Sequence, residues 1–575
     1  MHVVKGRSRH HEDGTMTDAS EWVRSRPNAN GTGTEPDSIG RRRAIQGWTA
    51  ALVMLCAGTS WLEFRHIEST LPYPQHVDEG FVSGPAHRTV MTGTLHPYTF
   101  NYPSLPKYLA AAGMAVGFLR GAAHLEIREI QKLGNVGYPY YETRRPMQSA
   151  RQLFALLSAI ALAATGLSAW LVFQRPATIL LAPLILLTSP LFFFRSWGYL
   201  NVDIVGTCFV TLTLAACLLG TRRPTIPQSA IVPSVFAGFA AGSKYTLGIV
   251  ALPVFLAIGL HFTGARRIWA WVAAFAATAA AFFVAVPYSL FDIPAFLNGL
   301  AFEAFHYASG HRGFSGEPGL PQLLYYARHF GSEFGVAAGI LAVLGVAAHA
   351  VGDWRRTAVL AVFPTGLLWL LASQRVHFTR NVLSLYPLFA MFAAFGLVSL
   401  HGWVLDLAAR QGWVAQTVKG PVRIAVALAL VATTVPLWHF VDHLRDRLDS
   451  RNRVNLWIEE NLPNGWTIVV PTQLGFDRRG IEASGRVVMV VDLQSARDAG
   501  RLQSLLGDVP SPAVIMVPRW GADARYPDGQ KLADVLNHLS RRWRALETFG
   551  TNEVLVNYSY PNPRGDPAFA VAVLK

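Results

Sequence analysis

Long apolar segments fill most of residues 44–440 and decide the environment in which this chain folds. The first covers about residues 44–62. Ten more follow at about residues 149–172, 177–194, 202–220, 230–243, 245–263, 268–288, 334–351, 357–373, 382–401 and 422–440. Most approach the ~20 residues that an α-helix needs to cross a bilayer. The sequence therefore predicts an α-helical polytopic membrane protein with about eleven transmembrane helices.

Composition agrees with this class. Charged residues make up 15% of the chain, whereas soluble proteins carry about a quarter. The net charge of +14 would suit a nucleic-acid partner, but no basic stripe with interleaved aromatic residues is present, so we expect no nucleic-acid binding. The three cysteines lie in apolar segments, where they read as small packing residues rather than disulfide partners.

Basic residues predict the orientation of the helices. Arg41, Arg42 and Arg43 precede the first apolar segment. By the positive-inside rule, these three arginines hold the N-terminus in the cytoplasm. Alternation then puts Arg175, Arg222, Arg223, Arg266, Arg267, Arg355, Arg356, Arg410, Lys419 and Arg423 in inner loops. Every predicted inner loop is thus basic. The short segments 230–243 and 245–263 could form a hairpin whose tip, residues 242–245, stays near the outer face.

Three regions follow from these patterns. Residues 1–40 are polar and predict a disordered cytoplasmic tail. Residues 41–440 form the transmembrane domain. Residues 441–575 are charged and lack a membrane-length apolar run, and an odd number of spans places them outside the cytoplasm. They predict a small α/β domain, with strands at 467–470, 487–491 and 513–517 and helices at 453–461, 496–506 and 531–546.

Two long outer loops separate the spans, at residues 63–148 and 288–333. The first contains an apolar stretch, residues 103–119. A twelfth span there would reverse the side of every later basic pair, so a helix lying in the membrane interface fits better.

Adjacent carboxylates, Asp78 and Glu79, stand in the first outer loop. Two neighbouring acids repel each other and are costly beside a membrane. One interpretation is a general base with a supporting or metal-binding carboxylate; the other is a capped loop with solvated acids. Asp203 opens a span on the same side, where it either caps the helix or supplies a second site carboxylate. Asp78, Glu79 and Asp203 are therefore also the candidate ligands if a divalent cation is used.

Cations occur on the same predicted face. Lys244 lies between two apolar segments, where it either snorkels or meets an anion. Arg375 and Arg380 run against the positive-inside bias, which either phosphate binding or lipid headgroup contact would explain. His306, His311 and Arg312 form a weaker cluster without metal-ligand spacing. Acids suit a hydroxyl acceptor and cations suit a phosphate, which at this face would come from a lipid.

The order of these motifs resembles the GT-C superfamily of integral-membrane glycosyltransferases, in the branch of protein O-mannosyltransferases and lipid A aminoarabinose transferases. The resemblance covers about residues 44–400. Its motifs are Asp78-Glu79, Gly93-Thr-Leu-His96-Pro, Asn101-Tyr102-Pro-Ser-Leu-Pro, Arg151, Ser189-Pro190, Asn201-Val-Asp203, Gly238 to Tyr245, Pro287-Tyr288, Gly310-His311 and Arg380 before Leu385-Tyr-Pro.

The resemblance implies an inverting transfer from a polyprenyl-phosphate-linked sugar. It implies that Asp78 is the base and Glu79 its support, that Asp203 is a second acid, and that Lys244 and Arg380 meet the donor phosphate. Aminoarabinose transferases carry a lysine where this chain has Tyr102, and the nearest lysine here is Lys107. Further candidates for the substrate cavity are His96, Tyr102, Lys107, Asn201, His306, His311 and Arg312.

We therefore predict a multi-pass glycosyltransferase of the plasma or inner membrane, involved in the cell envelope. Its donor would be a polyprenyl-phosphate sugar and its acceptor a lipid, glycan or protein hydroxyl. Two alternatives stay open: a transporter or flippase of lipid-linked sugars, which would place its site near the midplane and show duplicated halves, and a noncatalytic relative that scaffolds envelope assembly.

Overall fold

The structure is a computed structural model. It describes residues 38–127, 144–196, 199–222, 225–311, 314–411 and 450–471, with residues 129, 420, 428, 482, 485–491, 509, 512–518, 543–549 and 569–574. The chain divides into two units, residues 1–47 and 48–575. In the first unit only the opening turns of helix α2 (Ser38–Thr70) are described. The predicted disordered tail otherwise lies outside the described residues.

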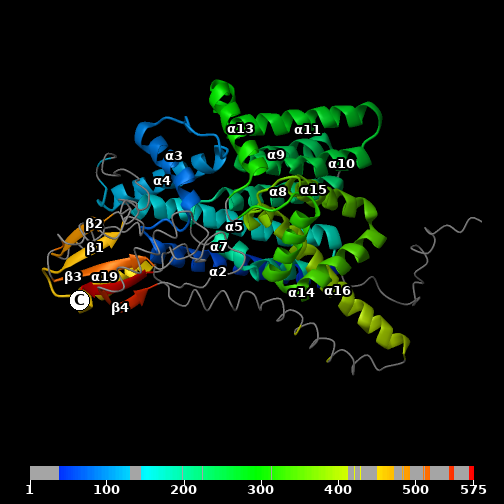
Figure 1. Ribbon diagram of the computed structural model, residues 1–575. Coiled ribbons are helices and arrows are strands. Elements are labelled where there is room, and N and C mark those ends of the chain that lie inside the picture. Colours follow the sequence, from blue (N-terminus) through cyan, green and yellow to red (C-terminus); the bar gives the residue numbers. More distant parts are fainter. Residues whose placement is uncertain are drawn as a thin grey trace, which may run out of the picture. The chain divides into compact units, whose positions relative to one another are not determined.

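The second unit is mainly helical (Figure 1). Its helices after α2 are η1 (Val77–Glu79), α3 (Gly80–Thr92), α4 (Leu105–Ala123), α5 (Arg144–Phe173), α6 (Thr178–Leu187), α7 (Pro190–Ser196), α8 (Val202–Arg222), η3 (Pro227–Ile231), α9 (Val232–Ser243), η4 (Tyr245–Val250), α10 (Ala251–His261), α11 (Gly264–Ala285), α12 (Tyr288–Phe291), α13 (Ile293–Ser309), α14 (Leu320–Gly352), α15 (Trp354–Ala372), η5 (Thr379–Leu385), α16 (Tyr386–Arg410) and α19 (Ser450–Asn461).

Seven helices within the described residues are long and apolar enough to cross a membrane. They run over Arg42–Thr70, Arg144–Phe173, Val202–Arg222, Gly264–Ala285, Leu320–Gly352, Trp354–Ala372 and Thr379–Arg410, and two shorter apolar helices cover Thr178–Leu187 and Tyr245–His261. The prediction of a polytopic helical membrane protein is confirmed. The number eleven is not reproduced, and the expected span at 422–440 lies outside the described residues, apart from residue 428.

Two predicted spans differ from the structure. The span expected at 177–194 breaks between α6 and α7, because Pro190 removes a backbone donor and disfavours helix at the residue before it. The span expected at 230–243 is the short helix α9, which continues from the π-turn η3. Chain direction then changes at Lys244, which has an extended backbone (φ −152°, ψ 120°) between α9 and η4. The segment predicted as an interfacial helix corresponds to α4.

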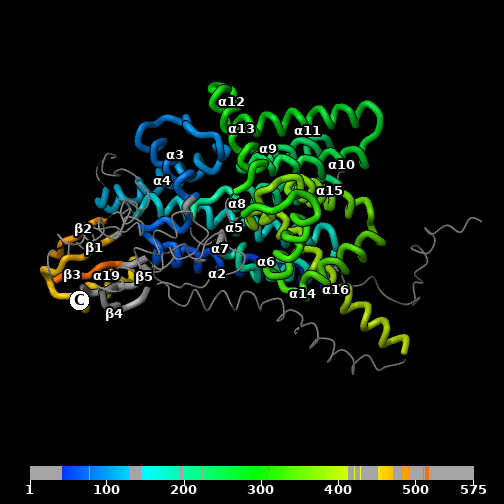
Figure 2. The backbone as a smooth tube through the Cα atoms, in the orientation of Figure 1, coloured from blue at the N-terminus to red at the C-terminus, as the bar shows by residue number. Residues whose placement is uncertain are grey.

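Small residues allow the helices to pack closely. Helices α9, α10 and α11 lie side by side (Figures 1 and 2). On the facing sides of α14 and α16, a Cβ at Gly345 would overlap the backbone of Phe392, and one at Gly396 would overlap that of Leu341. Close backbone approach of this kind is the usual way in which membrane helices associate. Helix α14 also bends at Gly335, whose φ of 76° only glycine adopts readily.

The C-terminal region contains a five-stranded sheet in the order β2-β1-β3-β5-β4. The strands are β1 (Thr467–Pro471), β2 (Val487–Val491), β3 (Ala513–Pro518), β4 (Trp543–Phe549) and β5 (Phe569–Leu574). Strands β2, β1 and β3 run parallel, and β5 pairs antiparallel with β3 and β4. Helix α19 packs Val454 and Ile458 against Ile468 and Val514.

Most predicted elements of this region coincide with the structure. The strands expected at 467–470, 487–491 and 513–517 correspond to β1, β2 and β3, and the helix expected at 453–461 corresponds to α19. The helix predicted over 531–546 was wrong for its last residues, 543–546, which belong to strand β4 because cross-strand pairing with β5 outweighs the local helical pattern; residues 531–542 lie outside the described residues. The helix expected at 496–506 lies outside the described residues.

Candidate active site

A single 3₁₀ turn, η1, presents the two adjacent carboxylates of the first loop. His76 is its N-cap, and His76 Nδ1 accepts a hydrogen bond from the backbone N–H of Asp78 at 3.1 Å. The His76 ring is buried and stacks on Tyr199 with ring centroids 5.4 Å apart. Because the turn is anchored on both sides, Asp78 and Glu79 project in fixed and different directions.

Glu79 is directed into the protein and is 0% exposed. Arg151 of α5 donates to both of its oxygens, from Nε to Oε1 and from Nη2 to Oε2, each at 2.9 Å. The backbone N–H groups of Gln75 and Leu200 donate to the same carboxylate at 3.0 Å. These four donors occupy Glu79 completely. These contacts tie the first loop to α5 and to the start of α8, and the supporting role predicted for Glu79 stays a prediction.

Asp78 is directed the other way, and its side chain is 22% exposed. Its Oδ2 lies 2.9 Å from Nη2 of Arg380 and accepts a hydrogen bond from the Tyr102 hydroxyl at 3.1 Å. Burial raises the pKa of Tyr102 well above its ordinary value, so the phenol stays protonated and can only donate to the carboxylate. Asp78 is therefore held by two donors while an edge stays accessible.

A second acid–cation pair lies beside the first. Lys244 Nζ is 2.9 Å from Asp203 Oδ1 and donates to Asn381 Oδ1 at 2.8 Å. The Tyr307 hydroxyl donates to the same Asn381 oxygen at 3.2 Å. Arg380, which meets Asp78, is the neighbour of Asn381 in η5. One turn of 3₁₀ helix thus joins the two pairs in one network.

The beginning of α8 places Asp203 beside Lys244. Asn201 precedes the helix, and its Oδ1 accepts a hydrogen bond from the backbone N–H of Ile204 at 2.9 Å. This is the N-cap interaction expected of asparagine. Asn201, predicted as a cavity residue, therefore satisfies a backbone N–H at the helix terminus, and Asp203 binds Lys244.

Helix α13 contributes residues to the same site. Glu303, His306 and Tyr307 stand three and four residues apart, on one face of the helix. Burial raises the pKa of Glu303 to about 7, and the nearby charges of Lys244 and Arg380 oppose this rise. Burial and the charge of Arg380 lower the pKa of His306. Glu303 is thus a carboxyl group that titrates near neutral pH within reach of both cations.

His311 lies next to His306, with ring centroids 5.1 Å apart. It also packs edge-on against Phe378, at 5.2 Å. Arg380 in turn lies over the Phe378 ring, with its guanidinium carbon 4.3 Å from the centroid. An aromatic and imidazole surface therefore borders the Asp78–Arg380 pair. Arg312, predicted with these histidines, lies outside the described residues.

Three predicted residues have other partners. His96 Nε2 lies 3.0 Å from Asp292 Oδ2. Lys107 is buried and donates to the carbonyl and hydroxyl oxygens of Thr99, and burial lowers its pKa to about 7. Arg375 is 52% exposed and lies 4.0 Å from Glu317, and its predicted role in phosphate binding stays a prediction.

The candidate metal ligands do not form a metal site in this arrangement. Within the described part of the chain, no three His, Cys, Asp or Glu side chains converge. Asp78, Glu79 and Asp203 each face a cationic side chain instead. A divalent ion would have to displace those cations.

Sequence reasoning missed three members of the network: Asn381, Tyr307 and Glu303. Asn381 directly follows Arg380 in the motif that drew attention to the arginine. Tyr307 and Glu303 stand one helical turn apart in the second outer loop, and a polar face on an otherwise apolar helix was the signal that could have found them.

Comparison with known proteins gives structural neighbours only. No protein-family model and no curated protein matches the sequence. The structure is similar to crystal structures of ArnT from Cupriavidus metallidurans in the apo state (11% identity, TM-score 0.48, covering 92% of this chain and 98% of that one) and bound to undecaprenyl phosphate (12%, 0.48, 91% and 98%). It is also similar to an Archaeoglobus fulgidus oligosaccharyltransferase in complex with Zn and sulfate (13%, 0.46, 87% and 72%).

Proposed function

We propose that this protein is an inverting glycosyltransferase that moves a sugar from a polyprenyl-phosphate-linked donor to an acceptor hydroxyl at the outer face of the plasma or inner membrane. One observation carries the proposal: η5 holds the pairs Asp78–Arg380 and Asp203–Lys244 in one network. A proton acceptor and two cations for a departing phosphate are the groups that such a displacement needs. The motif order described above points to the same chemistry.

Asp78 is the proposed general base. It is the more exposed carboxylate of the two pairs, at 22% against 5% for Asp203. In the proposed step the acceptor hydroxyl loses its proton to Asp78 as its oxygen bonds to the anomeric carbon. The bond from that carbon to the phosphate oxygen breaks, and its electron pair leaves with the lipid phosphate. Attack opposite the leaving group inverts the configuration.

Arg380 and Lys244 are the proposed phosphate ligands. In the structure each cation is already neutralised, Arg380 by Asp78 and Lys244 by Asp203. A bound phosphate would compete for both cations. Drawing Arg380 away from Asp78 would leave the Asp78 carboxylate without its closest donor. Donor binding would therefore open Asp78 to the acceptor hydroxyl when the base is needed.

Residues 441–575 form the proposed extracytoplasmic domain.

The proposed acceptor is a hydroxyl group of a lipid, a glycan or a protein. The surface made by His306, His311 and Phe378 borders Asp78 and offers flat groups against which a sugar ring can pack. In this proposal it belongs to the substrate cavity.

The test uses the purified full-length protein and a panel of radiolabelled polyprenyl-phosphate-linked hexoses and pentoses, with membrane lipid and glycan fractions as acceptors. Transfer of label and release of free polyprenyl phosphate are measured together. Asp78→Asn should lower transfer by roughly 10²- to 10⁴-fold, the usual contribution of a general base. Asp406→Asn changes an exposed aspartate at the far end of α16 and is the matched control.

The same assay separates the alternatives. A flippase would move the donor lipid between leaflets and leave its glycosyl bond intact, so no polyprenyl phosphate would be released. Full transfer by Asp78→Asn would remove Asp78 from the mechanism. Equal loss in Asp78→Asn and Asp406→Asn would show that the assay reports folding rather than chemistry.

A further inference from the structure

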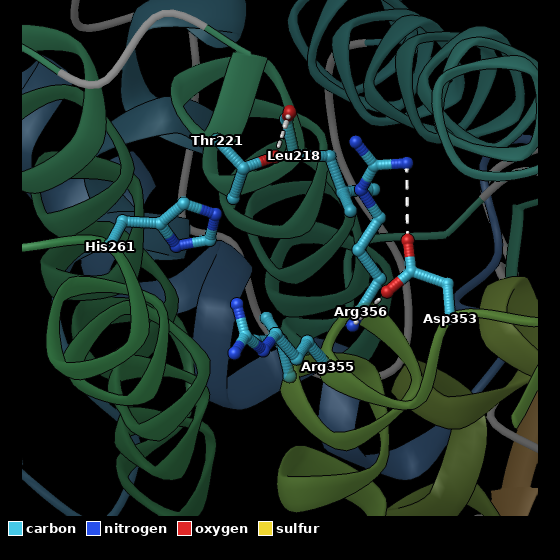
Figure 3. Close-up of a pocket in the computed structure, with 7 residues that line it drawn as sticks. Leu218, Thr221, His261, Asp353, Arg355 and Arg356 are labelled. Carbon is cyan, nitrogen blue, oxygen red and sulfur yellow. Dashed lines mark hydrogen bonds and ion pairs between the residues drawn. The ribbon is translucent and has the colours of Figure 1, made fainter. Parts of the chain in front are cut away.

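A pocket lies at the ends of helices α8, α10 and α15, away from the network around Asp78. Its lining includes Thr221, His261, Asp353, Arg355 and Arg356 (Figure 3). In the close-up these side chains surround one space, and the Arg355 guanidinium points toward His261. Two arginines and a histidine therefore face one carboxylate, and the pocket carries excess positive charge.

The length of helix α8 gives the separation between this pocket and the candidate active site, because one end of the helix lies at each. Asp203 stands in the first turn of α8 and Thr221 in its last turn. At about 1.5 Å per residue, this length of helix corresponds to roughly 27 Å, close to the ~30 Å of a bilayer's hydrocarbon core. The two sites therefore belong to opposite faces of the membrane. The pocket is at the face that the basic loops predict to be cytoplasmic.

Both oxygens of Asp353, the one carboxylate in the described lining of the pocket, contact Arg356. Asp353 Oδ2 lies 3.3 Å from Arg356 Nη1, and Asp353 Oδ1 accepts a hydrogen bond from the Arg356 backbone N–H at 3.1 Å. Arg355 packs over Trp354, with its guanidinium carbon 5.8 Å from the ring centroid. Among the described residues, Arg355 has no carboxylate partner. The guanidinium that points into the pocket is thus left for an anion.

Apolar side chains adjoin the charged lining. Behind it, Cys217, Ala257 and Val359 form a buried cluster. Close to Asp353 in the sequence, Val351 is 88% exposed and Trp354 is 61% exposed. A soluble phosphate makes no use of such surfaces, whereas a lipid places acyl chains beside its headgroup. Tryptophan is also the residue that favours the membrane interface.

We propose that this pocket binds the phosphate group of an anionic membrane lipid in the leaflet opposite the candidate active site. Arg355 and Arg356 would donate hydrogen bonds to the phosphate, the geometry that guanidinium groups favour. His261 Nδ1 faces the Ala257 carbonyl oxygen at 2.8 Å, so Nε2 donates to the phosphate only when both ring nitrogens carry a proton. Basic pockets between transmembrane helices bind lipid headgroups in this way.

The test measures lipid retention by native mass spectrometry of the full-length protein in detergent. Phosphatidylglycerol is the anionic probe, phosphatidylcholine the zwitterionic one, and glycerol phosphate and inorganic phosphate are the soluble ones. The variant is Arg355→Gln/Arg356→Gln, and Arg328→Gln, an exposed arginine in the opposite half of α14, is the matched control. A charge near the surface contributes about fivefold per arginine, so the double variant should retain roughly 25-fold less phosphatidylglycerol.

The outcomes discriminate the sources of the phosphate. Loss of phosphatidylglycerol in the double variant alone, with weak displacement by glycerol phosphate, supports the proposal. Displacement of the lipid by either soluble phosphate at equal concentration would assign the pocket to a soluble anion and overturn the lipid assignment. Equal retention by wild type and double variant, or an equal loss in Arg328→Gln, would overturn the site. The thermal midpoint of each variant without added ligand shows whether folding is intact.

Discussion

The adjacent carboxylates Asp78 and Glu79 of the first loop each pair with an arginine, and the two pairs differ in solvent exposure. Glu79 and Arg151 are both 0% exposed and share two hydrogen bonds. Asp78 and Arg380 share one close contact and stay partly open, at 22% and 10%. A sealed pair can only hold the backbone in place, whereas an open pair can exchange one partner for a ligand. The comparison therefore distinguishes a pair that holds the backbone in place, Glu79 and Arg151, from a pair that can bind a ligand, Asp78 and Arg380.

The scaffold pair should give the largest effect when it is broken. Glu79→Gln leaves the buried Arg151 guanidinium without its counter-charge, and breaking a buried ion pair costs about 3–5 kcal/mol. We expect a lower thermal unfolding midpoint in detergent and loss of transfer together. Glu126→Gln removes the carboxylate of an exposed pair with Arg145 and is the matched control, with an unchanged midpoint expected. A stable but inactive Glu79→Gln would instead place Glu79 among the reacting groups.

The open pair should respond in activity and not in folding. Arg380→Lys keeps the charge but replaces the planar guanidinium, which contacts Asp78 and stacks on Phe378, with a point charge. Loss of a hydrogen bond to a charged group costs about 1.5–3 kcal/mol, so transfer should fall roughly 10- to 150-fold. The control is Arg375→Lys, five residues earlier and exposed. Equal rates for the two variants would contradict the assignment of Arg380 to the site.

A smaller effect is expected from the hydroxyl that supports Asp78. Tyr102→Phe removes the donor at 3.1 Å and leaves Arg380 in place. An ordinary hydrogen bond contributes about 0.5–1.5 kcal/mol, so kcat should fall by about two- to tenfold. Tyr108→Phe is the control, because its hydroxyl binds the backbone oxygen of Leu95 outside the network. Transfer rates measured at saturating donor compare the two, and an equal loss in both would show that the Tyr102 contact is incidental.

The sequence could predict the members of the open pair but not the division of labour between the carboxylates. Apolar segments located most helices, and isolated charges among them drew attention to Asp78, Asp203, Lys244 and Arg380. Whether Asp78 or Glu79 stays partly exposed depends on η1, because a turn capped by His76 sends neighbouring side chains in different directions. The direction of each side chain depends on partners far away in the sequence, such as Arg151 for Glu79, and local sequence patterns do not reveal them.

Local sequence patterns also could not distinguish the two arginines that precede the tenth predicted span. Arg375 and Arg380 have the same charge and lie five residues apart, so composition treats them alike. In the structure Arg375 precedes η5 and is 52% exposed, whereas Arg380 lies within η5 beside Asp78 and is 10% exposed. Helical placement and not charge decides which arginine reaches the site. Glu303 was missed for a related reason: its burial depends on the packing of α13.

The last prediction concerns Glu303, which sharpens the comparison because its carboxyl group lies near the open pair of Asp78 and Arg380. Its pKa of about 7 lies above the ordinary value of 4.5, so between these values the folded protein binds a proton that the unfolded chain has lost. Stability should therefore fall as pH rises from about 4.5 to 7. Above pH 7 the ionised Glu303 would also compete with phosphate for Lys244 and Arg380, so the KM for the donor should rise through that pH.

Glu303→Gln should remove this rise in KM, because an amide does not ionise, and should leave kcat at pH 6 within a few-fold of wild type. The matched control is Glu317→Gln, a variant of a carboxylate that is 78% exposed and lies near Arg375; it should keep the wild-type profile. Donor KM measured from pH 5.5 to 8.5 decides the point. A wild-type profile without a step near pH 7, or a step that survives in Glu303→Gln, would mean that Glu303 does not compete with phosphate and that the open pair of Asp78 and Arg380 meets the donor alone.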